Sequence, residues 1–506
     1  MKKKNIVKLI TGIELIGVTF AYGNDNRPNV VFVLVDQMRN SAMNFWSQPE
    51  YEPFFNYKAD PVHTPVLDSI ARQSVVLTSA QSTFPLSSPY RGMMLTGMYM
   101  DNNGITQNCN NTRPFSSLKR SATAISDVFS QSGYSCAYFG KLHADYPTKN
   151  SPQNPGKYVE DIHPVWDAYT PPEDRHGFND WYSYGTYDVH KHPHYWDTKG
   201  NRHEISEWSP QHEADKVIDF LKNKTEKDKP FFIVWSTNPP HSPYNSLDDC
   251  MEKDFNLYKN IPLDSLLVRP NINPELTDKQ KCAPYYFASV TGVDREFGRV
   301  LKQLHEQGLD ENTIVVFTAD HGETMASHVL DAKNSAYNES MNVPFMIRYP
   351  EKLMPKVSRM MLTPVDIMPT LLSLAGMKKE IPASVEGKDL SLYLRNGDDE
   401  TIPKAVLYFS NIDGEKDKNG IVKNYFANAR GIKTDEYTLS IKIDKKGDIR
   451  EILFFNDKKD PYQMNNLSVT ENSKVFNQLC QQMGSMLREI DDQWYRKKVL
   501  NKIIPY

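Results

Sequence analysis

Ser87 opens the first stretch of sequence in which residue types and spacing point to chemistry. It begins the run S-S-P-Y-R-G-M-M-L-T-G, whose proline and apolar spacing predict a helix that starts at the serine and stops at Gly97. Free backbone N–H groups and the helix dipole at such an end favour negative charge on a ligand or on the nucleophile, and Arg91 adds a fixed cation one turn along. A serine there is also a common helix cap, so this run alone does not decide between the two roles.

Two apolar runs end in residues that could bind a metal. Asp36 and Gln37 follow V-V-F-V-L-V, and Asp320 and His321 follow T-I-V-V-F-T-A. Hard oxygen ligands favour Ca²⁺ or Mg²⁺. A single aspartate after a strand is more often a loop cap, so each pair alone indicates little.

Further motifs place lysines and histidines in loops. F-G-K-L-H contains Lys141 and His143, S-T-N-P-P-H ends in His241, and D-H-G-E-T-M-A-S-H-V-L-D-A-K contains His328 and Lys333. Isolated residues of these types in loops are usually only solvated. An imidazole titrates close to neutral pH, however, so His241 could act as a general acid.

The elements that must position these residues form an α/β pattern. Continuous apolar runs predict buried strands from residue 29 and over 135–139, 231–235, 313–318 and 343–347, with helical patterns over 65–74, 283–304 and 365–375. Ligands of such sheets gather beyond the carboxyl ends of the strands, which is where the motifs lie.

The pattern changes after the last of these helices. Residues 404–410 and 437–443 alternate like strands, and 474–491 has the pattern of a closing helix. We therefore predict a catalytic domain over residues 24–380 and a smaller C-terminal α+β subdomain over 381–506, with an antiparallel sheet and a closing helix.

Composition excludes several classes of protein. The chain has 506 residues, of which 39% are hydrophobic, and a net charge of −4 from 59 basic and 63 acidic residues, without a long run of one sign. This argues against a nucleic-acid binder. The five cysteines lack CxxC spacing, which excludes an obvious zinc knuckle or redox pair, and any disulfide pairing stays open.

The first 23 residues have a basic start, a short apolar stretch and small residues at a possible cleavage point. We predict a signal peptide over residues 1–23 and export to the periplasm or beyond the cell. Lys8 and Glu14 interrupt the apolar stretch, so an ordinary N-terminal helix is the alternative. No later stretch is long enough to span a bilayer, so we expect no stable membrane insertion.

Together these motifs resemble the formylglycine-dependent (type I) sulfatases of the alkaline-phosphatase superfamily, and bacterial carbohydrate sulfatases in particular. The signature of that family is C/S-x-P-x-R followed by a glycine six residues later, which Ser87, Pro89, Arg91 and Gly97 match. The closing run F-F-N-D-K-K-D-P-Y-Q-M-N-N-L is also similar to the family's. The resemblance implies an alkaline-phosphatase-like α/β fold, with a large mixed, mostly parallel sheet flanked by helices.

The same resemblance implies a modified nucleophile. Ser87 would be oxidised to formylglycine, whose hydrated aldehyde offers one hydroxyl to attack sulfur and a second to expel sulfate. An unmodified serine is a poor nucleophile, so a maturation enzyme acting on Ser87 is an implied partner. The serine form is typical of an oxygen-independent maturation enzyme and of an anaerobic bacterial source.

The resemblance also assigns roles to the other motifs. The catalytic residues would be Ser87, Arg91, Lys141, His143, His241 and Lys333, and the ligands of Ca²⁺, or less favourably Mg²⁺, would be Asp36, Gln37, Ser87, Asp320 and His321. Gln37 stands where many members have a second aspartate, which leaves its ligand role open. Lys141 and Lys333 would hold the sulfate, with His328 at the sulfate or supporting Lys333. His143 would assist release of the sulfated intermediate.

The run W-Y-S-Y-G-T-Y-D-V-H-K-H-P-H-Y-W, from residue 181 to 196, is dense in aromatic residues and histidines. Aromatic faces stack on sugar rings and imidazoles bind hydroxyls, so it favours a carbohydrate substrate such as a mucin or glycosaminoglycan fragment. The candidate substrate-binding residues in it are His190, His192, His194, Tyr195 and Trp196. The histidines could instead form a metal site or an exposed strand face.

Two other functions stay open at this point. Relatives with the same nucleophile and metal site hydrolyse phosphodiesters or phosphonate monoesters, and the sequence hardly separates these activities. A sulfoglycan-binding protein without catalysis is the alternative from another class. It could lose Lys141, His241 or Lys333 freely, whereas this chain retains all three.

Overall fold

The computed structural model describes residues 27–147, 165–223, 229–273, 275, 278–330, 332–399, 401–416, 418 and 422–503. The predicted signal peptide over residues 1–23 lies outside them. Within these ranges, no helix combines the length and the apolar character needed to cross a bilayer.

A ten-stranded sheet organises the larger part of the molecule. Across the sheet lie β10 (Lys356–Ser358), β2 (Val75–Leu77), β9 (Phe345–Arg348), β8 (Thr313–Ala319), β1 (Asn29–Val35), β7 (Phe231–Thr237), β3 (Ser135–Lys141), β4 (Asp180–Tyr184), β5 (His194–Asp197) and β6 (Arg202–Glu204). From β8 to β4 all neighbours are parallel, whereas β9, β5 and β6 pair antiparallel. Every residue of β1, β7 and β8 is buried, as their continuous apolar runs predict.

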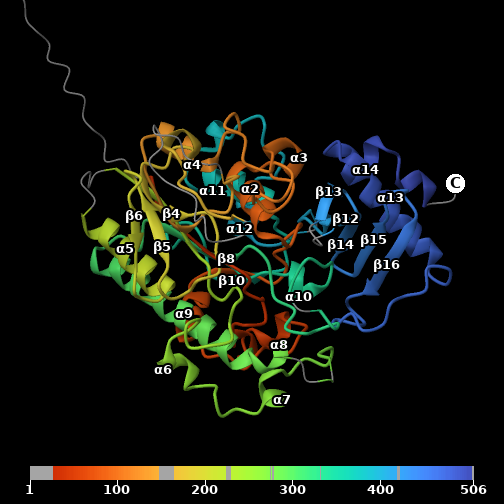
Figure 1. Ribbon diagram of the computed structural model, residues 1–506, viewed down its shortest axis with the longest axis horizontal. Coiled ribbons are helices and arrows are strands. Elements are labelled where there is room, and N and C mark those ends of the chain that lie inside the picture. The colour runs from red at the N-terminus through yellow and green to blue at the C-terminus, as the bar shows by residue number, and fades with distance from the viewer. Residues whose placement is uncertain are drawn as a thin grey trace, which may run out of the picture.

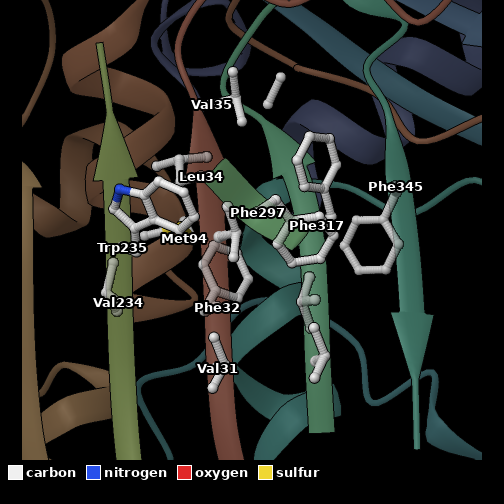
Figure 2. Close-up of a cluster of buried hydrophobic side chains, with 14 of the residues drawn as sticks. Val31, Phe32, Leu34, Val35, Met94, Val234, Trp235, Phe297, Phe317 and Phe345 are labelled. Carbon is white, nitrogen blue, oxygen red and sulfur yellow. The ribbon is translucent and has the colours of Figure 1, made fainter. Parts of the chain in front are cut away.

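Helices cover both faces of this sheet (Figure 1). One side carries α2 (Ser87–Thr96), α4 (Ile125–Gln131) and α11 (Pro364–Leu374), and the other carries α5 (Ser209–Asn223) and α9 (Ala283–Glu306). Figure 2 shows the resulting core, in which Phe317 of β8 lies beside Phe297 of α9, with ring centroids 5.1 Å apart. The shorter helices are α1 (Pro65–Ala71), α3 (Met100–Asn103), α6 (Glu252–Phe255), α7 (Leu263–Leu266), α8 (Asp278–Lys281), α10 (Asn338–Met341), α12 (Ser391–Asn396) and α14 (Gln493–Arg496).

The C-terminal part adds a separate antiparallel sheet beside the large one (Figure 1, blue). Its strands are β11 (Ala405–Ser410), β14 (Ala429–Thr434), β15 (Tyr437–Ile443) and β16 (Ile449–Asn456), and α13 (Ser473–Glu489) packs on it. A two-stranded hairpin, β12 (Asp413–Lys416) and β13 (Val422–Phe426), lies between β11 and β14 in the chain.

The predicted fold class is confirmed: a large mixed, mostly parallel sheet flanked by helices, with a smaller C-terminal α+β part. The boundary near residue 380 stays a prediction, because α12, which follows it, still contacts α11. The hydroxyls of Ser373 and Ser391 lie 3.0 Å apart across that contact.

Candidate active site

The carboxyl ends of neighbouring parallel strands bring the predicted residues together. Val35 of β1 pairs with Ala319 of β8, so Asp36 and Asp320 directly follow in adjacent strands. On the other side of β1, strand β7 leads to the N-P-P-H motif, and β3 ends in Lys141. The sequence does not reveal this order of strands, and it is this order that brings the motifs together in one place.

Gly140 allows β3 and β7 to approach closely just before Lys141. Its φ is 96°, and a Cβ atom there would lie 2.1 Å from the carbonyl oxygen of Ser236. No side chain larger than hydrogen fits, so the glycine of F-G-K is required by the backbone.

Ser87 points into the cluster at the strand ends. Helix α2 begins at Ser87 itself, and Leu86 occupies the N-cap position. The Ser87 hydroxyl lies 3.1 Å from Nε2 of His321 and 3.3 Å from Oδ2 of Asp36, and the residue is 1% exposed. The hydroxyl therefore faces acidic and imidazole groups rather than serving as the cap of its helix.

Arg91 ties the two carboxylates together. Its Nη2 lies 3.0 Å from Asp36 and 3.3 Å from Asp320, and its Nη1 donates to the hydroxyl of Ser236 at 2.6 Å. Burial alone would lower the pKa of this guanidinium, but the two carboxylates hold the pKa above its ordinary value. Arg91 is thus a permanent buried cation.

Two lysines approach the same point from different loops. Nζ of Lys141 lies 2.6 Å from Oδ2 of Asp36. Nζ of Lys333 lies 2.9 Å from Oε1 of Gln37, 2.8 Å from Nε2 of His241 and 3.1 Å from Nε2 of His321. Burial lowers the pKa of Lys333. Three cationic side chains therefore surround the Ser87 hydroxyl and the carboxylates beside it, an arrangement suited to an anionic ligand.

The two aspartates differ in proton affinity. Burial raises the pKa of Asp36, but Lys141 and the neighbouring histidines outweigh burial and hold it well below its ordinary value. Burial and the adjacent charge of Asp36 raise the pKa of Asp320 to about 7. The repulsion between the two carboxylates is the kind that a bound cation relieves.

The donor set fits a divalent cation. Asp36, Asp320 and His321 offer ligand atoms that all lie within 4.8 Å of one another. Nδ1 of His321 lies 3.1 Å from the carbonyl oxygen of Gly322, which leaves the Nε2 lone pair facing the carboxylates. The amide oxygen of Gln37 is held on the same side by Lys333. Carboxylate and amide oxygens suit Ca²⁺ or Mg²⁺.

Comparison with known families decides the identity. The family model described as "Sulfatase" matches residues 28–377, and the one described as "N-sulphoglucosamine sulphohydrolase, C-terminal" matches residues 327–493. The chain belongs to the sulfatase family. It is an enzyme that hydrolyses sulfate esters, as its motifs predict.

Individual relatives agree along nearly the whole chain. This sulfatase is 56% identical over 485 residues to an endo-4-O-sulfatase from Bacteroides thetaiotaomicron, with 95% of each chain covered. It is 31% identical over 487 residues to an ulvan-active sulfatase from Formosa agariphila, covering 92% of this chain and 82% of that one. A solved structure whose title describes metabolism of multiple glycosaminoglycans by B. thetaiotaomicron matches with a TM-score of 0.91 at 56% identity, covering 95% of this chain and 100% of the other.

His241 of this sulfatase has a defined hydrogen-bond arrangement. Nδ1 lies 2.6 Å from the carbonyl oxygen of Ser242 and 3.3 Å from a carboxylate oxygen of Asp188, while Nε2 faces Lys333. Burial and Lys333 lower the pKa of His241, whereas Asp188 raises it. The arrangement directs Nε2 into the site, where a proton could be donated.

His143 is buried at 3% exposure, and neither ring nitrogen has a hydrogen-bond partner among the described residues. Its ring meets that of Trp166 edge-on, with centroids 5.5 Å apart. Burial and Lys141 hold its pKa well below the ordinary value. Two unpaired polar atoms in such a place fit a residue that gains its partner from the substrate.

His328 and three residues of the aromatic segment have partners of their own. His328 stacks on Tyr337 at 3.7 Å and lies 3.0 Å from the amide nitrogen of Asn271. Further along the sheet, buried side chains bind one another: His194 and Trp196 lie 2.6 and 3.0 Å from Asp167, and Tyr195 lies 2.9 Å from Glu213. Such hydrogen bonds between buried side chains stabilise a core. Contact of these residues with a sugar stays a prediction.

The other two histidines of the segment differ from each other. His190 is 2% exposed, and its Nε2 lies 3.1 Å from the side-chain nitrogen of Asn238. The amide oxygen of Asn238 in turn accepts from Lys141 at 2.9 Å, so His190 adjoins the site. His192 is exposed.

Several residues at the site were not predicted from the sequence. Asn238 bonds Lys141, Ser236 bonds Arg91, Asp188 contacts His241, and Glu323 accepts hydrogen bonds from Gln37 and Tyr244. Asn238 and Glu323 belong to motifs that were recognised, N-P-P-H and D-H-G-E, and carried a signal. Asp188 had no such signal in the sequence, because only the conformation of its loop brings it to His241.

Proposed function

We propose that this sulfatase releases sulfate from a glycan, with Ser87, matured to formylglycine, as the nucleophile. The position of the Ser87 hydroxyl supports this most directly. It lies within 3.3 Å of both Asp36 and His321, in a buried cluster with three cationic side chains. When Ser87 is oxidised, the hydrated aldehyde supplies a hydroxyl that attacks sulfur and a second that expels sulfate.

The surrounding side chains bind and orient the sulfate group. Lys141, Lys333 and Arg91 provide fixed positive charge, so the charge that spreads over the sulfate oxygens in the transition state is stabilised without reorganisation of water. Asp36, Gln37, Asp320 and His321 would hold a Ca²⁺ ion, or less favourably Mg²⁺, which would supply Lewis-acid polarisation of a sulfate oxygen. His143 donates to, or accepts from, the bound group through its two unpaired ring nitrogens.

His241 supplies the proton that the leaving alcohol needs. The carbonyl of Ser242 holds the Nδ1 proton, so Nε2 must carry a second proton before it can act as an acid. The carboxylate of Asp188 at 3.3 Å favours that imidazolium state. Lys333 must withdraw from Nε2 when this proton is present, and a bound sulfate oxygen gives it another partner.

We propose a 4-O-sulfated glycosaminoglycan as the substrate, attacked within the chain. The 56% identical relative is named an endo-4-O-sulfatase, and the similar structure is described in the context of glycosaminoglycan metabolism. Export through a signal peptide over residues 1–23, and maturation of Ser87 by an oxygen-independent enzyme, belong to the same proposal.

Sulfate release tests this proposal. Enzyme co-produced with a maturation enzyme should release sulfate from 4-O-sulfated glycosaminoglycan oligosaccharides, and Ser87→Ala should release none. A chelator should abolish the activity and added Ca²⁺ should restore it.

A panel with bis-4-nitrophenyl phosphate and a phosphonate monoester separates the alternative hydrolase activities. Faster turnover of either ester than of every sulfate would contradict the proposal. Tight binding of sulfated oligosaccharides without sulfate release by the matured protein would favour the non-catalytic binding protein.

A further inference from the structure

A guanidinium without an acidic partner lies on the loop that adjoins the nucleophile. We propose that Arg113 binds the carboxylate of a uronic acid residue next to the sulfated sugar. The inference rests on the proposed function and adds a second anionic contact to it.

The loop that carries Arg113 is attached to the start of helix α2. The backbone N–H of Ser88 donates to the side-chain oxygen of Asn108 at 3.1 Å, and the N–H of Cys109 donates to the hydroxyl of Ser88 at 3.1 Å. Ser88 directly follows the nucleophile, so this loop cannot move far from Ser87 without breaking both bonds.

A second attachment places Arg113 beside the His143 side of the site. Asn111 exchanges two hydrogen bonds with the backbone of Val165, of 2.8 and 3.1 Å. The next residue is Trp166, whose ring meets His143 edge-on. Arg113 lies over the same Trp166 ring, 5.5 Å from its centroid. The Trp166 ring thus contacts both Arg113 and a predicted catalytic residue.

The C-terminal hairpin adds a second aromatic contact to Arg113. Tyr425 of β13 also lies against the guanidinium, with its ring centroid at 5.6 Å. Two aromatic rings therefore hold the planar group in place while leaving its N–H donors free, and this lowers the entropy lost when a ligand binds.

The charge of Arg113 is not neutralised by the protein. Among the residues that the structure describes, no carboxylate and no hydrogen-bond acceptor pairs with its guanidinium. Partial burial lowers its pKa, and its titratable neighbours are Tyr425 and Cys109. Burial raises the pKa of the Cys109 thiol to about 12, so this neighbour is neutral.

A partly buried cation of this kind fits a planar anion supplied by the substrate. A guanidinium binds a carboxylate through two parallel N–H donors. Many glycosaminoglycans alternate a hexosamine with a uronic acid, so a carboxylate follows the sulfated sugar along the chain. A second sulfate on the neighbouring sugar is the other source of negative charge, and the test must separate the two.

The test compares matched oligosaccharides on the matured enzyme. One substrate is a 4-O-sulfated hexosamine–uronate oligosaccharide, and the other is the same molecule with its carboxylates reduced to alcohols. We expect the wild type to show a KM about tenfold or more higher for the reduced substrate, as for loss of a charge-assisted pair. Arg113→Gln should raise the KM for the intact substrate to a similar degree and no longer distinguish the two.

Two controls separate this role from a structural one. Arg120→Ala removes a nearby arginine that is already paired with Asp174, and it should leave the discrimination of the wild type unchanged. Hydrolysis of 4-nitrophenyl sulfate, which has no carboxylate, should change less than about twofold in Arg113→Gln.

The inference is overturned if Arg113→Gln still distinguishes the two substrates, or if it loses the same factor on 4-nitrophenyl sulfate. It is also overturned if the wild type ignores carboxylate reduction but responds to a second sulfate. Failure of the proposed function has a different signature, because the wild type would then release no sulfate from any of these substrates.

Discussion

Two clusters of buried polar side chains lie near the carboxyl ends of the strands of the large sheet. The first region surrounds Ser87 and the second surrounds Asp167, and they differ in how completely their hydrogen-bonding atoms are paired. Around Ser87, charged side chains share partners and some atoms have none in the described structure, such as both ring nitrogens of His143. Around Asp167, the carboxylate receives donors from His194, Trp196 and the backbone of Gly185.

The difference separates a site from a scaffold. A network that is internally satisfied stabilises the fold, while one with an excess of positive charge and unpaired atoms is completed by a ligand. Histidine and aromatic content alone cannot tell the two apart, since both regions are rich in them.

Loss of Lys333 should have the largest effect on the first region. Lys333→Ala removes a cation that contacts Gln37, His241 and His321, so kcat/KM for a sulfated oligosaccharide should fall about a thousandfold. Stability should change little or rise, because burial penalises this lysine. Steady-state kinetics and thermal unfolding measure the two quantities. Lys302→Ala, an exposed lysine of α9, is the control and should change neither.

The second region should respond in the opposite way. His194→Ala leaves the buried Asp167 carboxylate without one of its donors, so the free energy of unfolding should fall by about 3 kcal/mol. Urea unfolding measures it, and kcat/KM of the folded fraction should stay within about threefold. A raised KM with unchanged stability would contradict the comparison and favour the predicted sugar contact of His194.

Glu213, which bonds Tyr195 and Trp235 beside the second region, should make stability depend on pH. Burial raises its pKa to about 7, above its value in the unfolded chain. The folded protein therefore holds this proton more tightly, and stability is lost as pH rises through about 7. The Gln side chain of Glu213→Gln cannot ionise. The melting temperature of this variant relative to the wild type should therefore rise between about pH 5 and pH 8, by the equivalent of about 2 kcal/mol. A gap that is independent of pH would show that Glu213 does not titrate in this range.

The smallest effect should be a shift of the pH profile. Asp188 raises the pKa of His241, so Asp188→Asn should lower it further and move the basic limb of kcat/KM to lower pH. The carboxylate is half exposed and screened, so we expect about half a pH unit. The control is Asp248→Asn, an exposed aspartate that should leave the profile unchanged. A shift to higher pH in Asp188→Asn would contradict the assignment.

The sequence predicted the fold from local patterns that the sheet preserves. The run of residues before Asp36 is continuously apolar because β1 is buried on both faces, so its pattern needs no knowledge of the partners. The short strands escaped prediction. β2 is buried but has only three residues, which are too few to show a pattern, and β6 is fully exposed, so it lacks the burial that produces one.

The site was predictable where a residue belongs to a motif with fixed spacing. Lys333 and Asp320 are close in sequence, and both lie beside His321 in the site, as the motif indicates. Asp188 and Arg113 were not predictable, because their positions depend on loops held by contacts with distant segments. Their contacts, His241 for Asp188 and Tyr425 for Arg113, lie far along the chain, and nothing in the sequence relates them to these loops.

The most direct test of the account is the mass of the peptide that contains Ser87. We predict that active enzyme from its natural host carries a Ser87 side chain lacking two hydrogen atoms, as an aldehyde requires, and that sulfate release scales with the modified fraction. Full activity in a sample whose Ser87 is entirely unmodified would contradict the account.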